Sequence, residues 1–387
     1  MAILNSVADG LGDVRAWRRH LHANPELMFD VHETAKFVAE KLREFGCDEV
    51  VTGIGRTGVV GLINGNRGSG PTIGLRSDMD ALPITERRDL PHKSKTSGKM
   101  HACGHDGHMA MLLGAARHFA ETRNFSGRIA VIFQPAEEGG GGGRVMVEDG
   151  LMGRFDIERV YGMHNMPGIP VGEFAIRKGP FFAATDEFAI TIIGKGGHAA
   201  MPHRANDPVV IGAQIVQAFQ TIASRSVDPL ASIVVSVTKF NAGTAHNVIP
   251  ERVTLAGTMR TLTPENRAFG EKRMREIVDG VVAAYGARAE FGFHRGYPVT
   301  VNDGDEALIC ADAAQTVTDA IHVNSEAEPL MGGEDFAYML EAKPGAMILI
   351  GNGDTAGLHH PDYDFNDDAL GWGVSYWVKL AETQLAA

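Results

Sequence analysis

The sequence predicts an α/β fold in which a mixed, mainly parallel sheet is flanked by helices and interrupted by a smaller inserted domain. Helical and strand patterns alternate over the first 180 residues, and an order of β-α-β-β-α-β runs from about 186 to 295. The alternating pattern returns after Pro298, and 387 residues are many for a single core. We therefore expect a discontinuous domain of residues 1–181 and 297–387 and a ferredoxin-like insert of residues 182–296.

The segments outside the insert alternate between amphipathic and apolar patterns. Apolar residues at helical spacing predict two early helices, whose faces are Val14, Trp17 and Leu21, and then Phe37, Val38, Leu42 and Phe45. Short apolar runs bounded by Gly, Pro or charged residues predict buried strands at 58–63, 72–75 and 128–133. An Ala-, Leu- and Met-rich helix is expected at 109–119. The last part predicts a helix at 306–321, a strand at 347–350 and a closing helix from Asp368.

The insert has a different rhythm. Phe188, Ile190 and Ile192 alternate with polar residues, as in a half-buried strand. The remaining elements are expected as an amphipathic helix at 209–223, strands at 233–240 and 252–261, a helix at 264–285 and a strand at 289–293. This order predicts one four-stranded antiparallel sheet with two helices.

Charge and composition exclude several classes of partner. The formal net charge is −12, whereas nucleic acids and anionic membranes require a basic face. The three cysteines are too few and too scattered for a disulfide framework. We find neither a signal peptide at the N-terminus nor an apolar run that approaches a membrane span. We expect a cytoplasmic protein that binds neither nucleic acid nor membrane.

Metal-binding side chains are concentrated between His101 and His108, where the sequence reads His-Ala-Cys-Gly-His-Asp-Gly-His. Within it, a Cys103 thiolate could bridge two cations while the His105 imidazole serves one of them. Further donors follow predicted strands and are expected at the same sheet edge, namely Glu137, Glu138, His164, His359 and His360. Of two neighbouring acids, one can bind metal while the other faces a water as a base. This pattern predicts a metal-dependent hydrolase with two ions.

Other interpretations of these motifs remain open. A structural zinc site is the main alternative, although such sites are usually closed sets rich in Cys. His101 and His108 fit supporting or packing positions better than ligand positions. The glycine run at 139–143 resembles a phosphate-binding loop, but Arg144 follows where such a loop carries Lys and Ser or Thr. A flexible turn beside the acid pair is the simpler reading of that run.

Several motifs together resemble one family of di-metal amidohydrolases. The family includes hippurate hydrolase, N-acyl-amino-acid amidohydrolases and plant auxin-conjugate hydrolases. The matching stretches cover nearly the whole chain: they begin at Arg19, Leu75, His101, Gln134, Gly194, Met331 and Leu358 and read RHLHANPEL, LRSDMDALP, HACGHDGHMAMLLGAA, QPAEEG, GKGGHAAMPH, MGGEDF and LHHP. The resemblance implies a zinc-peptidase-like fold for the interrupted domain.

The resemblance also implies a role for individual residues of the centre. Cys103 corresponds to the bridging thiolate and Glu137 to the general base. The other ligands correspond to His105, Glu138, His164 and His359, the last chosen over His360 because it stands two residues before a proline. The wider superfamily carries His-x-Asp where this chain reads Arg76-Ser-Asp78. Asp78 is therefore expected among the catalytic residues as an acid that orients a ligand.

For the insert, the resemblance implies a lid and dimerisation domain. His198 would reach the active site of the partner subunit and polarise the scissile carbonyl. Asn247 and Arg260 would contact substrate, as would Gly332 of the interrupted domain, and Arg260 suits a grip on a carboxylate. A plain surface charge on a strand is the alternative for Arg260. We expect a homodimer or a higher homo-oligomer formed through this domain.

The predicted reaction is hydrolysis of an N-acyl (acetyl, benzoyl or arylacetyl) amino acid to a carboxylate and a free amino acid. Two divalent ions, from among Zn, Mn, Co and Ni, would activate water, and Glu137 would take its proton and return it to the leaving nitrogen. The nearest alternative is a dipeptidase or metallo-carboxypeptidase that uses the same site. A non-catalytic metal-dependent binding protein is a further alternative. Glu137 argues against it, because binding alone does not require an acid that lies beside the metals without being a ligand.

Overall fold

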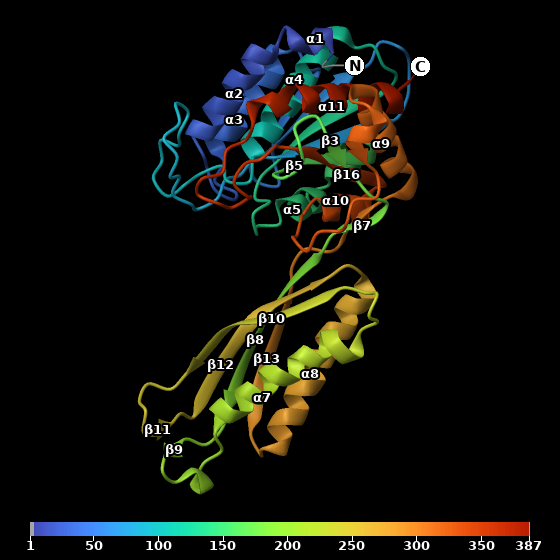
Figure 1. Ribbon diagram of the computed structural model, residues 1–387. Helices are drawn as coiled ribbons and strands as arrows, with labels where there is room; N and C mark the ends of the chain where they lie inside the picture. The colour runs from blue at the N-terminus through green and yellow to red at the C-terminus, as the bar shows by residue number, and fades with distance from the viewer. Residues whose placement is uncertain (1–3, 387) are drawn as a thin grey trace. The chain divides into compact units, whose positions relative to one another are not determined.

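The computed structural model describes residues 4–386, and the chain separates into two compact units (Figure 1). Unit 1 comprises the chain up to Phe181, Val301–Glu328 and the residues from Asp335 onward. Unit 2 comprises Phe182–Thr300 and Pro329–Glu334. The short second segment joins unit 2 because the Ala183 amide donates to the carbonyl oxygens of Leu330 and Gly332.

Unit 1 is built on an eight-stranded mixed sheet. In spatial order its strands are β1 (Glu49–Ile54), β2 (Gly58–Asn64), β4 (Arg128–Gln134), β3 (Thr72–Asp78), β5 (Ile157–Met166), β16 (Gly345–Gly351), β6 (Phe174–Ala175) and β15 (Val323–Asn324). Neighbours among β4, β3, β5 and β16 are parallel, and β1, β2 and β4 pair antiparallel. The predicted mixed, mainly parallel sheet is confirmed.

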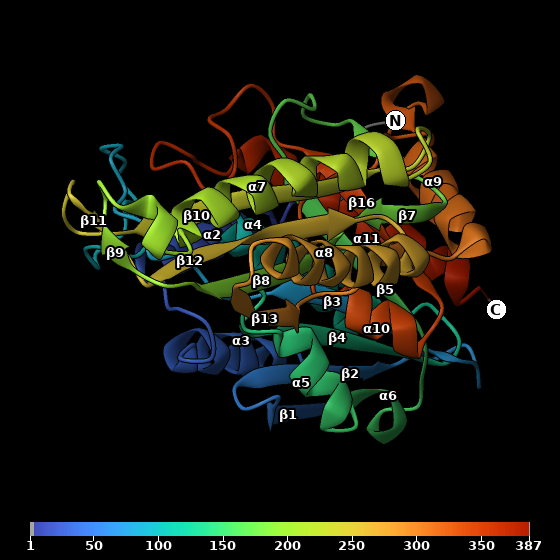
Figure 2. The ribbon, with the colours of Figure 1, turned by 90° about the horizontal axis from the view of Figure 1, so that it is seen from below.

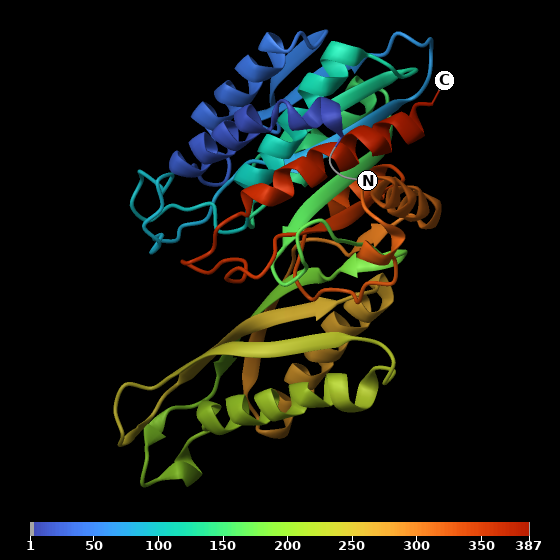
Figure 3. The ribbon, with the colours of Figure 1, turned by 45° about the horizontal axis from the view of Figure 1, so that its top comes forward.

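Helices cover both faces of this sheet. They are α1 (Asn5–Ala8), α2 (Leu11–Ala23), α3 (His32–Glu44), α4 (His105–Thr122), α5 (Gly142–Glu148), α6 (Leu151–Arg154), α9 (Gly304–Val317), α10 (Ala337–Ala342) and α11 (Leu370–Gln384). Figure 3 shows α2, α4 and α11 over one face, and Figure 2 shows α5 and α10 on the other. Because both faces are covered, β3 is buried along its whole length and reads as a continuous run rather than an alternation.

Several element boundaries differ from the sequence prediction, and three features near the site follow from where the elements begin and end. Helix α4 begins at His105, earlier than the predicted 109, because Gly104 turns the chain with a left-handed φ of 87°. Strand β4 ends at Gln134, so Glu137 and Glu138 lie in a turn beyond it rather than at its end. His164 lies within β5, two residues before its last residue.

Unit 2 has an antiparallel four-stranded sheet in the order β10-β12-β8-β13. Its elements are β8 (Ala184–Ile193), α7 (Pro208–Thr221), β10 (Ile233–Ala242), β12 (Arg252–Thr261), α8 (Pro264–Ala284) and β13 (Arg288–Arg295). Their order along the chain is the predicted β-α-β-β-α-β. Phe188, Ile190 and Ile192 point from β8 into a core shared with α7 and α8. Asp207 and Thr263 cap the two helices, each followed by proline at the first helical position.

Two small sheets complete the chain. Strands β9 (Gly197–His198) and β11 (Val248–Ile249) pair antiparallel at one end of unit 2 (Figure 1). Strands β7 (Gly179–Phe182) and β14 (Thr300–Asn302) form the other. Among the described residues, no helix has both the length and the apolar character needed to cross a membrane.

Candidate metal centre and active site

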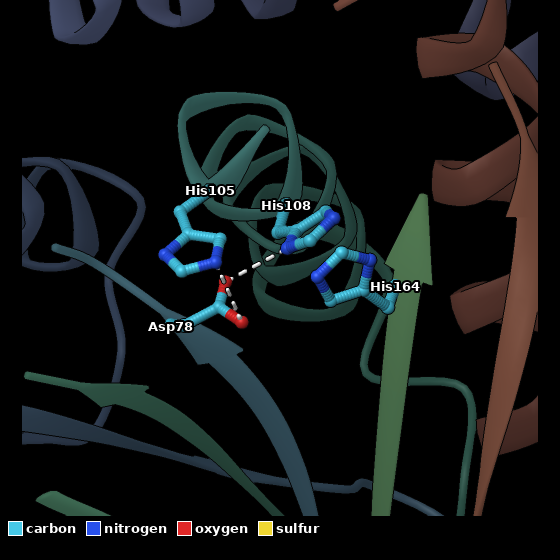
Figure 4. Close-up of side chains that lie close together, drawn as sticks. All are labelled: Asp78, His105, His108 and His164. Atoms are coloured by element: carbon cyan, nitrogen blue, oxygen red, sulfur yellow. Dashed lines mark hydrogen bonds and ion pairs between the residues drawn. The ribbon is translucent and has the colours of Figure 1, made fainter. Parts of the chain in front are cut away.

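The donors of unit 1 meet at the carboxyl end of its parallel strands. Asp78 is the last residue of β3, His164 lies near the end of β5, and His105 is the first residue of α4. Figure 4 shows Asp78 between His105 and His108, with His164 beside them. A parallel sheet places its sites at this edge because the strands end there together.

Cys103, Glu138 and His359 form the first group of possible metal ligands, with one donor atom of each within 4.8 Å of the others. The sulfur of Cys103 also lies 3.4 Å from Nε2 of His164. A second group combines His105 with Glu137 and Glu138, within the same limit. Since Glu138 belongs to both groups and Cys103 faces His164, the predicted donors surround one small volume.

The ring orientation of two histidines is determined by backbone carbonyls. Nδ1 of His105 donates to the carbonyl oxygen of Asp80 at 2.7 Å, and Nδ1 of His164 donates to that of Asn165 at 2.6 Å. Each ring therefore keeps Nε2 as the atom that can accept a metal ion. Such a hydrogen bond behind the ring is the usual arrangement for a ligating histidine.

The structure separates the two neighbouring histidines of the C-terminal loop. Nε2 of His359 lies 3.3 Å from Oε1 of Glu138, whereas Nδ1 of His360 accepts a hydrogen bond from the Asp362 amide at 3.2 Å. His359 has a left-handed φ of 64°, and its amide donates to the carbonyl of Ala102, which ties this loop to the Cys103 loop. The geometry thus favours His359 over His360 as a donor.

Asp78 and His108 support the centre from behind. Nδ1 of His108 donates to Asp78 at 2.8 Å, and Nε2 of His108 accepts from the Asn165 amide at 2.9 Å, so both ring nitrogens are used. Asp78 also accepts from Arg76 at 3.0 Å and lies 3.6 Å from Nε2 of His105. His108 is therefore a supporting residue. Arg76, which stands where the wider superfamily carries a histidine, pairs with Asp78.

Asp80 is a functional candidate that the sequence analysis did not single out. Its two carboxylate oxygens accept the backbone N–H groups of Glu137 and Glu138 at 3.0 and 3.1 Å. Its carbonyl orients His105. One buried acid thus holds both the acid pair and a histidine. The signal was present, because Asp80 stands two residues after Asp78 in the quoted Leu75 motif.

Burial and crowding shift the pKa values of the donors. Burial, together with Glu138 and Glu137, raises the pKa of the Cys103 thiol well above its usual range. Burial alone lowers the pKa of His105, but Asp78 and Asp80 outweigh it and raise the value to about 10. Burial opposes ionisation of Glu138, yet His359 and His105 hold its pKa below the ordinary value.

These residues fit divalent cations. Among the described residues, Nε2 of His105 and Oε1 of Glu138 are buried atoms that make no hydrogen bond, and buried polar atoms of this kind need a partner. A cation between them would satisfy both and would also favour the thiolate form of Cys103. Cys, His and carboxylate together suit zinc and related transition metals.

A buried charged network lies on the far side of α4 and was also missed. Nδ1 of His22 pairs with Asp106 at 2.9 Å, and its Nε2 lies 3.3 Å from Glu86. Arg18 reaches Asp106 at 3.4 Å and Asp367 at 2.7 Å. The Arg19 motif of the sequence therefore supplies support for the helix that begins with His105.

The predicted substrate residues of the insert, His198, Asn247 and Arg260, lie in unit 2 but in separate places, and Gly332, which the sequence analysis assigned to the interrupted domain, also lies in unit 2. His198 and Asn247 are neighbours, since Val248 pairs with His198 and the Ala199 amide donates to the Asn247 carbonyl at 3.1 Å. Arg260 lies near the far end of β12 and donates to Thr258. Gly332 is exposed, and its carbonyl accepts from Ala183 at 2.9 Å.

The donor set and fold agree with comparisons against known proteins. A model of peptidase family M20/M25/M40 matches residues 74–383. The chain belongs to this family. Hippurate hydrolase of Campylobacter jejuni is 42% identical over 382 residues, covering 98% of this chain and 99% of that protein.

Two further comparisons cover most of the chain. The N-acyl-L-amino acid amidohydrolase of Geobacillus stearothermophilus is 48% identical over 297 residues, which are 76% of this chain and 79% of that protein. The crystal structure of the Bacillus subtilis YxeP protein, described as a dinuclear metal-binding peptidase of the M20 family, matches with a TM-score of 0.86. It is 36% identical and covers 98% of this chain and 99% of its own.

Proposed function

We propose that this M20 protein is a metal-dependent amidohydrolase that cleaves the amide bond of N-acyl amino acids to a carboxylate and a free amino acid. One observation carries the proposal: Glu137 and Glu138 are held side by side by Asp80 next to the Cys103 donor group. The names of the hippurate hydrolase and N-acyl-L-amino acid amidohydrolase relatives support the substrate class.

We assign the metal ligands to Cys103, His105, Glu138, His164 and His359, with Asp78 orienting the centre through His105 and His108. Two divalent ions, from among Zn, Mn, Co and Ni, would polarise the amide carbonyl and lower the pKa of a water when bound. Cys103 would supply a sulfur donor that both ions could share, since its sulfur lies 3.4 Å from Nε2 of His164 and within 4.8 Å of a Glu138 donor.

Glu137 is assigned the proton transfers. Its carboxylate, which is buried, would remove a proton from the attacking water and give it to the leaving nitrogen as the amide bond breaks. The hydrogen bond from the Glu137 backbone N–H to Asp80 supports this role, because a base must be held within hydrogen-bond reach of the proton that it moves.

A homodimer in which unit 2 serves as lid is part of the proposal. Arg260 lies eight residues along β12 from Arg252, which is roughly 26 Å at 3.3 Å per residue, while β9 and β11 adjoin the Arg252 end. Since His198 and Arg260 of one subunit are so far apart, both can contact one small substrate only if they come from different subunits. Substrate contacts by Asn247 and Gly332, and a cytoplasmic location, remain predictions.

The test compares benzoyl-, acetyl- and indoleacetyl-amino acids with dipeptides of the same C-terminal residue. Release of the amino acid should be faster from the acyl substrates, should require added metal after chelation, and should fall in Glu137→Gln. Faster dipeptide cleavage would instead identify a peptidase. Metal binding without hydrolysis of any substrate would identify a binding protein.

A further inference from the structure

Asn165 follows the donor His164 in β5, and its side chain and backbone are hydrogen-bonded throughout. The residue is fully buried. Its backbone N–H donates to Nε2 of His108 and its carbonyl accepts from Nδ1 of His164. These two bonds already connect one donor histidine with the supporting residue behind Asp78.

The orientation of the Asn165 amide is determined by its neighbours. Nδ2 donates to the Cys103 carbonyl at 2.6 Å and lies 3.0 Å from Nε2 of His108. Oδ1 accepts from the hydroxyl of Tyr363 at 2.7 Å. The reverse orientation would place Oδ1 against the Cys103 carbonyl oxygen and would leave the hydroxyl facing an NH₂ group. Only the observed orientation satisfies every group.

Tyr363 brings the C-terminal loop to the same point. Its backbone N–H donates to the carbonyl of His360 at 2.9 Å, so the ring is attached to the turn that carries His359. No side chain separates the two segments, because a Cβ on Gly104 would overlap the Asn165 amide nitrogen and the Tyr363 hydroxyl. The contact therefore joins the Cys103 loop, β5 and the His359 loop through one amide.

We propose that Asn165 and Tyr363 are positioning residues of the metal centre. The Tyr363 hydroxyl, acting through the Asn165 amide, holds the Cys103 peptide and the His359 loop at the spacing that the cations require. This inference rests on the proposed metal-dependent function. The physical reason is that a donor set distributed over separate loops binds metal tightly only when hydrogen bonds behind it limit its movement.

A metal titration with Tyr363→Phe tests this role. The variant removes one buried oxygen and leaves the ring in place. Tyr376→Phe is the matched control, because Tyr376 of α11 is equally buried but packs against Phe174 of β6 and its neighbour Trp377. Metal-free protein is titrated with Co²⁺, and binding is followed by the absorption that a thiolate ligand adds to the cobalt spectrum.

We expect the wild type and Tyr376→Phe to bind Co²⁺ alike. Tyr363→Phe should bind Co²⁺ about 10-fold more weakly, which is near the smaller loss of metal affinity seen when a hydrogen bond to a metal ligand is removed. Its thiolate absorption band should also be shifted. At saturating metal, kcat should fall while KM changes little, since neither residue is assigned to the substrate. A role in folding alone would lower the thermal midpoint and leave the cobalt spectrum unchanged.

Asn165→Asp is the second variant. It keeps the shape of the side chain but replaces the donor that faces Cys103 and His108 with oxygen, so we expect a loss of about 100-fold in Co²⁺ affinity. In a Tyr363→Phe background the same change should cost less, because the two residues act as one unit.

The outcomes separate this inference from the proposed function. A wild type that binds no Co²⁺ would refute the metal-dependent function and the positioning role together. A wild type that binds Co²⁺ and hydrolyses acyl amino acids, with Tyr363→Phe matching it in affinity and spectrum, would refute the positioning role alone. Independent, multiplicative effects of the two variants would refute the coupling through the amide.

Discussion

Two adjacent acids with different surroundings dominate the site at the residue scale. Glu138 lies against His359, which together with His105 keeps its pKa low, as a ligand requires. The backbone N–H of Glu137 donates to the Asp80 carboxylate, which also accepts the N–H of Glu138. Sequence neighbours therefore enter one site with separate environments, and this is the arrangement that base and ligand need.

Replacing each acid by its amide should separate the two roles. We predict that Glu137→Gln keeps its metal content and loses at least about 10²-fold in kcat, since a general base is removed. Glu138→Gln should instead lose metal, because an amide is a weaker ligand than a carboxylate. Elemental analysis and steady-state kinetics on the same samples measure both effects. The opposite pattern would mean that the two assignments must be exchanged.

His359 and His360 offer a matched pair in the same loop. We predict that His359→Ala lowers metal content and activity, because its Nε2 faces Glu138. His360→Ala should retain both, because the His360 ring accepts from the Asp362 amide. Metal analysis after dialysis against a weak chelator is the measurement. Equal losses in the two variants would contradict the assignment drawn from the loop geometry.

The start of α4 controls the site at the scale of elements. Gly104 turns the chain so that Cys103 lies in the loop before the helix and His105 on its first turn. The turn requires glycine for two reasons: a positive φ of 87°, and the close approach of Asn165 and Tyr363.

Substituting alanine for Gly98 and for Gly104 distinguishes the cost of the positive φ from the cost of the close contact. Gly98 has a φ of 78° and no atom within 4 Å of an added Cβ, so Gly98→Ala should cost only about 1–2 kcal/mol of backbone strain. Gly104→Ala adds overpacking and should cost about 1–3 kcal/mol more. It should also weaken metal binding. Chemical unfolding of both variants gives the comparison, and equal costs would mean that the Gly104 contact is unimportant.

The contact between α2 and α4 predicts a pH dependence of stability. Burial alone lowers the pKa of His22, but Asp106 and hydrogen bonds to Asp106 and Glu86 outweigh it and raise the value from 6.5 to about 9. Because the folded pKa is the higher one, protonation stabilises the fold. This stability is fully present below pH 6.5 and is lost as the pH rises through about 9.

We therefore predict that the free energy of unfolding of the metal-free protein falls between these pH values. His22→Asn should remove the part of this decrease that His22 contributes. At high pH, the free energy of unfolding of the variant should be closer to that of the wild type. Urea unfolding at several pH values measures the slope. Identical slopes for wild type and variant would show that His22 is not protonated in the folded protein.

At the scale of the whole molecule, the chain divides its proposed functions between two units. Unit 1 carries every assigned metal ligand, and unit 2 carries His198, Asn247 and Arg260. His198 lies in the small β9–β11 sheet beside the Arg252 end of β12, whereas Arg260 lies near the other end of that strand, so under the proposed function a dimer would bring both residues to one substrate. The oligomer is thus part of the catalytic proposal.

Mixing two inactive variants tests whether His198 acts in the active site of the partner subunit. If His198 acts in the partner's site, dimers of His198→Ala and Glu137→Gln contain one site with both residues intact. Random exchange makes about half of the dimers mixed, so about a quarter of the wild-type activity should return. Kinetics after exchange, with mixing verified by differently tagged chains, give the answer. Complete exchange without recovery would place His198 in its own subunit's site or outside catalysis.

The sequence by itself determined much of the fold and the kind of site. Periodicity was sufficient for α2, β2, β4 and the β-α-β-β-α-β order of unit 2, because buried strands and amphipathic helices have distinct spacings. The cluster from Cys103 to His105 and the acid pair at Glu137 predicted a metal-dependent hydrolase, because few other sites need these residue types together.

Only the tertiary structure decided which polar side chains act together. Asp80 and Asn165 each contact segments distant in the sequence, and although Asp80 stands in the quoted Leu75 motif, only the fold shows which groups the two residues hold. The resemblance had already favoured His359 over His360, and the structure adds a physical reason, because His359 has a left-handed φ and its Nε2 lies 3.3 Å from Oε1 of Glu138. Local sequence controls the spacing of neighbours along the chain, whereas the meeting of separate loops depends on packing of the whole unit.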